Sequence, residues 1–294
     1  MTFSYRLKKE LCEIRPFNRE LQYAQLSGLL MFCKEFDNNI VLFSTDYFEI
    51  AEYFTKLIKH IFKYNADIYK AQKLTNVDAV VYTVSITDSN IVDKLNEMVD
   101  NISDFINSTE AVSAYIRGAF LACGTITDPE KSYHIEFITQ YENAAEFLCD
   151  IISNLSINAK ISKRKGNYIV YLKESTNIED LVTYMGATKS TLALMDVKVY
   201  KDMRNKVNRI TNCETANLNK TVTASAKQIE DIKKIEKNMG IESLSDDLKQ
   251  IAIIRLKNPD MSLSEIATEV VPPISRSGVN HRFKKISEIA AKIK

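Results

Sequence analysis

Two stretches decide the fold of this chain, LQYAQLSGLLMFCKEF (residues 21–36) and AYIRGAFLACGTIT (residues 114–127). Both are apolar with helical spacing and place a glycine near the centre, so that Gly28 aligns with Gly118. Further along the chain, FEIAEYFTKLIKHIF (48–62) matches YENAAEFLCDIISNL (141–155). Two matches in the same order indicate an internal duplication within residues 1–196.

Each copy continues with the same order of elements. Alternating apolar residues predict strands at NIVLFST (39–45) and AVVYTVSI (79–86), and again at YHIEFIT (133–139) and NYIVYLKE (167–174). Amphipathic helices separate and close the strand pairs. We therefore predict an α+β domain at 21–196 with two αββαββα repeats, 21–107 and 111–196, which follows a helical extension at 1–20.

Composition limits the class of protein. The 294 residues are 45% hydrophobic and 26% charged, and no apolar run approaches the length of about 20 residues that spans a bilayer. The five cysteines include no CxxC pair and accompany three histidines, which disfavours a zinc module and is typical of reduced thiols. We expect a cytoplasmic protein without membrane contact.

Basic charge is concentrated near the C-terminus. Residues 200–294 hold 18 basic and 12 acidic side chains, against 21 and 26 in residues 1–199. Between 276 and 294 there are six basic residues and one acid. An excess of this kind either neutralises phosphates or solvates a helical tail.

A second basic segment, KISKRKGNYIVYLK (160–173), contains no acid. The turn residues Lys165-Gly166-Asn167 between two β-prone runs predict a hairpin. Its side chains Lys163, Arg164 and Lys165 would either make a secondary contact with nucleic acid or protect an edge strand from aggregation.

Strand patterns end at Asp196. Residues 197–239 predict two helices around the polar stretch NCETANLNKT (212–221), and we interpret 197–224 as a semi-rigid helical connector. The connector is rich in side chains that form hydrogen bonds, which could contact phosphate or the acidic surface of a partner, or could fix the two domains by polar capping. These side chains are Arg204, Asn205, Arg209, Asn212, Asn217 and Lys220.

The remaining residues, 225–294, predict three short helices. The stretch SDDLKQIAIIRLKN (245–258) stops before Pro259 and has an apolar face made of Leu248, Ile251, Ala252 and Leu256. Ser262 and Glu265 fit a capping box for a second helix that ends at Val271. Ser275 can cap the third helix.

The third helix has two distinct faces. A buried stripe is predicted at Val279, Phe283, Ile286 and Ala290. The opposite face carries Arg276, Ser277, Asn280, His281 and Lys284, and the first four of these are expected to contact bases. Arg282, Lys285 and Lys292 are expected nearer the DNA backbone. This is the pattern of a helix-turn-helix, and the alternative on these residues alone is a plain three-helix bundle.

Several of these segments resemble known families. LSGLLMFCK (26–34) and IRGAFLACG (116–124) resemble degenerate copies of the motif of LAGLIDADG homing endonucleases. YIRGAFLACGTITDPEKSYHIEF (115–137), MRNKVNRITNCETANLNKTV (203–222) and SRSGVNHRF (275–283) resemble the bacterial WhiA family. The resemblance implies a DNA-binding transcriptional regulator, involved in sporulation in some bacteria and in cell division and chromosome segregation in others.

The endonuclease resemblance also bears on catalysis. In those enzymes each motif helix ends in an acidic residue, and the two acids hold the divalent metal for strand cleavage. Cys33 and Cys123 occupy these positions here, and a neutral thiol is a poor magnesium ligand. We therefore expect no catalytic residues, metal or other cofactor. Glu35, Asp37 and Asp128 lie nearby and would serve either as replacement ligands or as loop caps.

Two residue pairs are placed near the axis between the repeats. Gly28 and Gly118 are expected where the motif helices cross, because only a missing Cβ lets the backbones approach closely. The resemblance brings Cys33 and Cys123 near each other, where they would either pack as buried thiols or form a redox-sensitive pair.

The predicted function is that of a non-enzymatic, sequence-specific DNA-binding regulator at the nucleoid. Its predicted partners are double-stranded DNA and the transcription or division machinery, with no small-molecule substrate. One alternative is an active LAGLIDADG-type endonuclease, and another is a cell-division interaction protein with incidental DNA contact. The chain has no GxGxxG or P-loop to support a cofactor enzyme.

Overall fold

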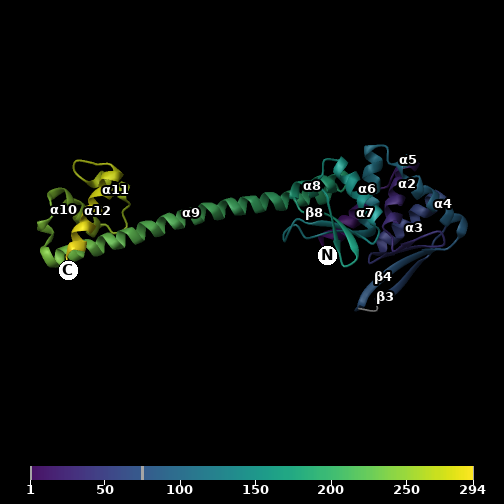
Figure 1. Cartoon of the computed structure of the whole chain (residues 1–294), viewed down its shortest axis with the longest axis horizontal. Helices are drawn as coiled ribbons and strands as arrows, with labels where there is room; N and C mark the ends of the chain where they lie inside the picture. Colours follow the sequence, from purple (N-terminus) through teal and green to yellow (C-terminus); the bar gives the residue numbers. More distant parts are fainter. Residues whose placement is uncertain (1, 74–75, 294) are drawn as a thin grey trace. The chain divides into compact units, whose positions relative to one another are not determined.

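The computed structural model describes residues 2–73 and 76–293 (Figure 1). The chain divides into two compact units, Met1–Lys201 and Asp202–Lys294. The long helix α9 (Thr188–Met239) begins in the first unit and ends in the second. Within the described ranges, no helix has an apolar stretch long enough to cross a membrane.

The first unit contains two repeats with the same order of elements, except that the short helix α5 of the first has no counterpart in the second. The first repeat comprises α2 (Arg19–Met31), β1 (Glu35–Phe36), β2 (Val41–Thr45), α3 (Phe48–Phe62), β3 (Ile68–Lys73), β4 (Asn76–Ile86), α4 (Ser89–Asp100) and α5 (Ile102–Phe105). The second comprises α6 (Thr109–Cys123), β5 (Gly124–Ile126), β6 (Ile135–Thr139), α7 (Glu142–Asn154), β7 (Lys160–Arg164), β8 (Asn167–Leu172) and α8 (Ser175–Tyr184).

The two repeats form two equivalent antiparallel sheets. The strand orders are β1-β2-β4-β3 and β5-β6-β8-β7, so each strand of one sheet has its counterpart at the same place in the other. This correspondence confirms the predicted duplication and the α+β fold class.

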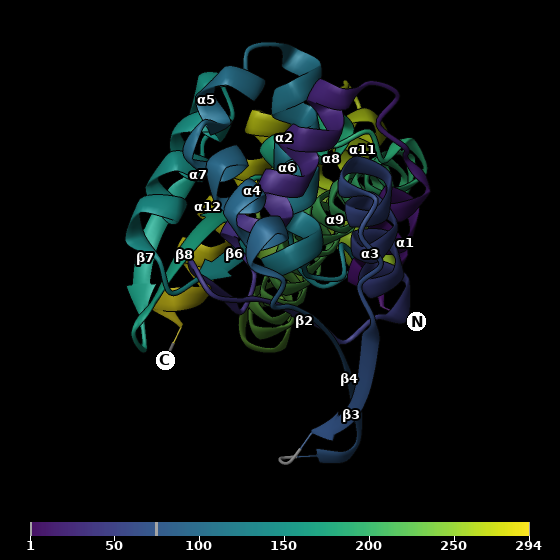
Figure 2. The same cartoon turned by 90° about the vertical axis from the view of Figure 1, so that its right-hand side faces the viewer.

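Helices α2 and α6 cross with their backbones in direct contact. Figure 2 shows them side by side at the centre of the first unit. A Cβ added at Gly28 would lie 2.2 Å from the carbonyl oxygen of Tyr115, and one added at Gly118 would lie 2.1 Å from that of Gln25. These distances leave no room for a side chain at either position, which confirms the expected glycine crossing.

An N-terminal helix, α1 (Phe3–Glu13), completes the core of the first unit. Its side chains Phe3, Leu7 and Leu11 are buried in the same apolar cluster as the two repeats. The Thr2 hydroxyl caps the helix by accepting a hydrogen bond from the amide of Tyr5. The same buried face of α1 includes a charged residue, Lys8.

The prediction of two helices within residues 197–239 is wrong, because a single helix, α9, runs from Thr188 to Met239. The reason is that this range contains neither glycine nor proline, and its Asn, Thr and Ser residues are tolerated in a helix interior at small cost. The helix ends where Gly240 adopts a positive φ of 74°.

The second unit packs the end of α9 against η1 (Ile241–Ser243) and three helices, α10 (Asp246–Lys257), α11 (Leu263–Glu269) and α12 (Arg276–Lys292). Ser262 and Glu265 form the predicted capping box. Helix α11 ends at Glu269 rather than at Val271, since Val270 already has an extended backbone ahead of the Val271-Pro272 pair.

The apolar face predicted for α10 is wrong at one position. Leu248, Ile251 and Ala252 are buried as expected, but the fourth buried residue is Arg255, whereas Leu256 is half-buried. Arg255 is 1% exposed and its guanidinium spans the following turn. It donates hydrogen bonds to the carbonyl oxygens of Asn258, Pro259 and Met261 at 3.4, 3.0 and 2.6 Å, and to the Gln228 side chain at 3.0 Å.

Gly118→Ala should lower the free energy of unfolding of the first unit by about 3 kcal/mol, because the added methyl group forces the two motif helices apart. Urea unfolding followed by circular dichroism measures this loss. Gly278→Ala is the matched control, since a Cβ on this helical glycine of α12 meets no atom nearer than 3.4 Å. Equal losses for the two variants would contradict the crossing.

Arg255→Ala should lower the free energy of unfolding of the second unit by about 2–4 kcal/mol, because it removes charged hydrogen bonds and leaves a cavity. Thermal unfolding compares the stability of this variant with that of the unchanged chain, and Arg276→Ala, at an exposed arginine, is the control. A loss below about 0.5 kcal/mol would show that the buried guanidinium has no structural role.

Candidate nucleic-acid interface

Helix α12 is held by a cap and an apolar stripe. The Ser275 hydroxyl accepts a hydrogen bond of 3.1 Å from the Gly278 amide at the start of the helix. The predicted stripe of Val279, Phe283, Ile286 and Ala290 is buried, at most 3% exposed, and packs against α10 and α11. This confirms which face of α12 points inward and fixes the other face toward solvent.

The outward face of α12 carries most of the predicted DNA-contacting side chains. Arg276, Ser277, Asn280, His281, Lys284 and Lys285 are all exposed. Ser277 shares a 2.9 Å hydrogen bond with Ser275. Arg276 lies in the first turn, where the positive end of the helix dipole also favours an anion, whereas Lys284 and Lys285 lie in the middle of the helix.

Arg282 differs from its neighbours on α12. It is half-buried, and its Nε lies 3.5 Å from the Asp247 carboxylate at the start of α10. A hydrogen bond from Ser245 and the charge of Arg282 lower the pKa of Asp247. Arg282 thus links α12 to α10, and its charge is partly offset within the chain.

The basic hairpin of the second repeat has the predicted turn. Lys165 and Gly166 have φ values of 49° and 83°, as a type I′ turn requires, and strand β7 is exposed along its whole length. Lys163 donates a 2.6 Å hydrogen bond to the Tyr168 hydroxyl, which in turn donates to Glu142 at 2.8 Å. The charge of Lys163 is therefore shared with an acid, whereas Arg164 and Lys165 make no ion pair among the described residues.

The ends of the two motif helices hold thiols in an environment that keeps them neutral. The Cys33 thiol donates to the Glu35 carbonyl at 3.2 Å and the Cys123 thiol to the Ala119 carbonyl at 3.4 Å. Burial raises the pKa of each to about 12. Both cysteines are free thiols, and a neutral thiol offers a hard divalent cation no useful ligand.

A buried ammonium lies at the end of α6. Lys8 from α1 donates to the Leu121 carbonyl at 3.4 Å and is 7% exposed. Burial lowers its pKa to about 8, so that the side chain is still mostly protonated at neutral pH. The Leu121 carbonyl lies two residues before Cys123, so the positive charge held against it opposes the binding of a metal cation near that thiol.

Two of the three nearby acids cap their own loops. Asp37 accepts hydrogen bonds from the amides of Asn39 and Ile40 at 2.7 and 3.1 Å, and Asp128 accepts one from Glu130 at 3.0 Å. Glu35 is exposed on the short strand β1. Among the described residues, no group of three or more His, Cys, Asp or Glu side chains is arranged to hold a metal.

Sequence reasoning missed two residues with a role at these sites, Lys8 and Arg255. Both fall on an apolar helical stripe, Lys8 beside Leu7 and three residues before Leu11, and Arg255 three residues after Ala252. A charge on a buried stripe is the signal that could have identified them.

The free energy of unfolding should fall as pH rises above about 9, because folding holds the Cys33 and Cys123 thiols at a pKa of about 12 against an ordinary value of 9.0. A thiol whose pKa is raised by folding contributes its full stabilisation below the pKa of the unfolded chain. This contribution is lost as pH rises from the unfolded pKa through the folded pKa, by up to about 1.4 kcal/mol per pH unit for each thiol. Cys33→Ala with Cys123→Ala should flatten this slope in urea titrations between pH 8 and pH 11, whereas the exposed Cys213→Ala should not. An unchanged slope in the double variant would contradict the burial argument.

Comparisons with known proteins bear on both units. The model of the WhiA LAGLIDADG-like domain matches residues 112–204, and that of the WhiA C-terminal HTH domain matches residues 207–290. Proteins named "Probable cell division protein WhiA" from Thermoanaerobacter pseudethanolicus and Clostridium botulinum are each 38% identical to this chain. Both alignments include 100% of this chain, and they include 98% of the first relative and 99% of the second.

A solved structure supports the same fold. The crystal structure of full-length DUF199/WhiA from Thermotoga maritima has a TM-score of 0.64 at 23% identity and covers 100% of this chain and 99% of its own. The match confirms the resemblance noted in the sequence. With 38% identity over the full length of curated relatives, the chain belongs to the WhiA family.

Proposed function

We propose that this protein binds double-stranded DNA in a sequence-specific manner through α12 and regulates transcription. The observation that carries the proposal is the outward face of α12, where Arg276, Asn280 and His281 project from the first turns of a helix whose other face is anchored in a packed core. Arginine and asparagine make bidentate contacts with guanine and adenine, and residues near the start of a recognition helix reach the bases.

The proposed division of labour assigns DNA contact to residues 225–294. Exposed Lys284 and Lys285 neutralise phosphates, and Arg282 orients α12 through Asp247 while remaining within reach of the backbone. The duplicated domain at 21–196 serves as a scaffold without strand cleavage, attached through the connector at 197–224 and preceded by the extension at 1–20. Arg164 and Lys165 on the basic hairpin form a secondary contact with nucleic acid.

The proposed biological role is in cell division and chromosome segregation, exerted at the nucleoid. The name of the relatives, "Probable cell division protein WhiA", supports a role in cell division. A regulator that reads DNA connects to division by controlling the expression of division components, and this makes DNA binding the activity to test first.

Selection from a random pool of double-stranded DNA, followed by fluorescence anisotropy on the enriched site, tests the proposal. Arg276→Ala or Asn280→Ala should weaken specific binding by about 1–3 kcal/mol and relax the base preference at one position. Lys285→Ala should weaken binding to all sequences alike and reduce the salt slope by about one. Lys233→Ala, an exposed lysine on α9, is the matched control and should have no effect.

Two results would overturn the assignment. One is undiminished DNA affinity in a chain that lacks residues 225–294. The other is magnesium- or manganese-dependent strand cleavage that disappears when Glu35 or Asp128 is replaced by alanine, because this outcome would restore the endonuclease alternative.

A further inference from the structure

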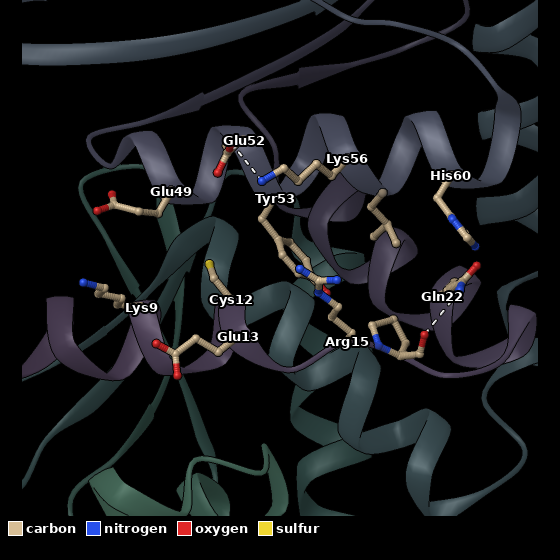
Figure 3. Close-up of a pocket in the computed structure, with 12 residues that line it drawn as sticks. Lys9, Cys12, Glu13, Arg15, Gln22, Glu49, Glu52, Tyr53, Lys56 and His60 are labelled. Atoms are coloured by element: carbon tan, nitrogen blue, oxygen red, sulfur yellow. Dashed lines mark hydrogen bonds and ion pairs between the residues drawn. The ribbon is translucent and has the colours of Figure 1, made fainter.

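Two cavities of the first unit share a wall, the linker of residues 14–18 between α1 and α2. One has a volume of about 590 Å³ and lies between α1 and α3 (Figure 3). The other has a volume of about 450 Å³ and is bounded by the linker and by residues of α2, α6 and α8. We name them the α1–α3 cavity and the linker cavity. Both are in the size range of small-molecule sites, about 300–1,000 Å³.

Two carboxylates of the α1–α3 cavity have partners within the chain. Figure 3 shows acidic and basic side chains of α3 facing those of α1 across the cavity. Glu52 pairs with Lys56 at 2.8 Å, and Glu49 accepts a 2.6 Å hydrogen bond from the Tyr5 hydroxyl. These pairs match part of the charge, and none of the described residues that line the α1–α3 cavity has a buried side-chain nitrogen or oxygen without a hydrogen-bond partner.

The linker cavity, in contrast, is lined by an unmatched cation. Arg117 on α6 is 6% exposed, and its Nη1 donates a 3.2 Å hydrogen bond to the Met185 carbonyl. Its Nε is buried with no hydrogen-bond partner. No carboxylate in the described ranges pairs with this guanidinium, since the acid on the cavity wall, Glu110, is exposed and forms no ion pair with it. An unpaired buried charge is strongly unfavourable.

Two further polar side chains lie in this region. Gln25 on α2 is fully buried, and its side-chain amide interacts with the Tyr53 hydroxyl. The Tyr53 hydroxyl donates to the Ile14 carbonyl of the linker at 3.3 Å. Burial raises the pKa of Tyr53 while the charges of Arg117 and Arg15 oppose this rise, so both guanidiniums lie close to its ring. Arg15 lines both cavities and adds a second positive charge.

The linker also supplies an apolar wall. Phe17 lines the cavity and is 83% exposed, which leaves a large aromatic surface in water. Ile14, Pro16 and Leu21 line the cavity beside it. The buried Arg117 guanidinium and the exposed Phe17 ring are therefore complementary to a molecule with one negatively charged end and one apolar end.

We propose that the linker cavity binds a small organic anion, whose carboxylate or phosphate group is held by the Arg117 guanidinium and whose apolar body packs against Phe17, Pro16 and Leu21. The planar guanidinium is suited to either oxyanion. The anion would supply the counter-charge that the chain does not provide. This gives the first unit a ligand-binding role that does not depend on DNA binding by the second unit.

Isothermal titration calorimetry of the full chain at constant ionic strength tests the proposal with phenyl phosphate, benzoate, inorganic phosphate and benzyl alcohol. Phenyl phosphate or benzoate should bind with one-to-one stoichiometry, and the tighter of the two identifies the preferred oxyanion. Inorganic phosphate should bind more weakly because it lacks the apolar body, and benzyl alcohol should not bind because it lacks the charge.

Variants assign the binding to the cavity. Arg117→Met should weaken anion binding by about tenfold or more, and Arg6→Met, at an exposed arginine of α1 that does not line the linker cavity, should leave it unchanged. Arg117→Lys keeps the charge and should also weaken binding, which decides the question if Arg117→Met does not fold. Phe17→Ser should weaken binding of phenyl phosphate but not of inorganic phosphate.

The proposal is overturned if neither organic anion binds more tightly than benzyl alcohol, or if both Arg117 variants bind as the unchanged chain does. Thermal unfolding without added anion gives an independent readout. Because Arg117→Met removes an unpaired buried charge, its melting temperature should equal or exceed that of the unchanged chain.

Discussion

The first unit depends on the approach of two helix backbones. At the crossing of α2 and α6, the carbonyl oxygens of Gln25 and Tyr115 occupy the positions where side chains would begin at Gly118 and Gly28. Contact at this distance excludes water and buries the flanking residues of both helices. Each repeat contributes one helix to the crossing, so neither repeat can bury its central helix without the other. Each repeat also contributes one of the two sheets.

The C-terminal ends of the two crossing helices carry thiols rather than carboxylates. Thiols with a pKa of about 12 remain neutral and are poor ligands for hard cations. In addition, the buried ammonium of Lys8 places a positive charge against the Leu121 carbonyl at the end of α6. Both features disfavour a metal ion while the helix packing is retained.

Much of this could be predicted from the sequence, because the duplication, the glycine crossing and the caps of α11 and α12 depend on local patterns. Ser262 with Glu265, and Ser275, are recognisable from spacing alone. The single helix α9 was not predicted, because its polar residues disfavour a helix too weakly to break it. Lys8 and Arg255 were missed because hydrophobic patterning excludes charges from a core, and their partners are backbone carbonyls that the sequence does not reveal.

Two buried arginines among the described residues, Arg117 and Arg255, differ in how their charges are satisfied. Arg255 is enclosed by three carbonyl acceptors and one side-chain amide, so its burial cost is offset within the second unit. Arg117 has one carbonyl acceptor and an unpartnered Nε. An apolar residue at 117 would avoid this cost. A residue that lowers stability at the centre of a packed core, beside a cavity, has the features of a site kept for a ligand.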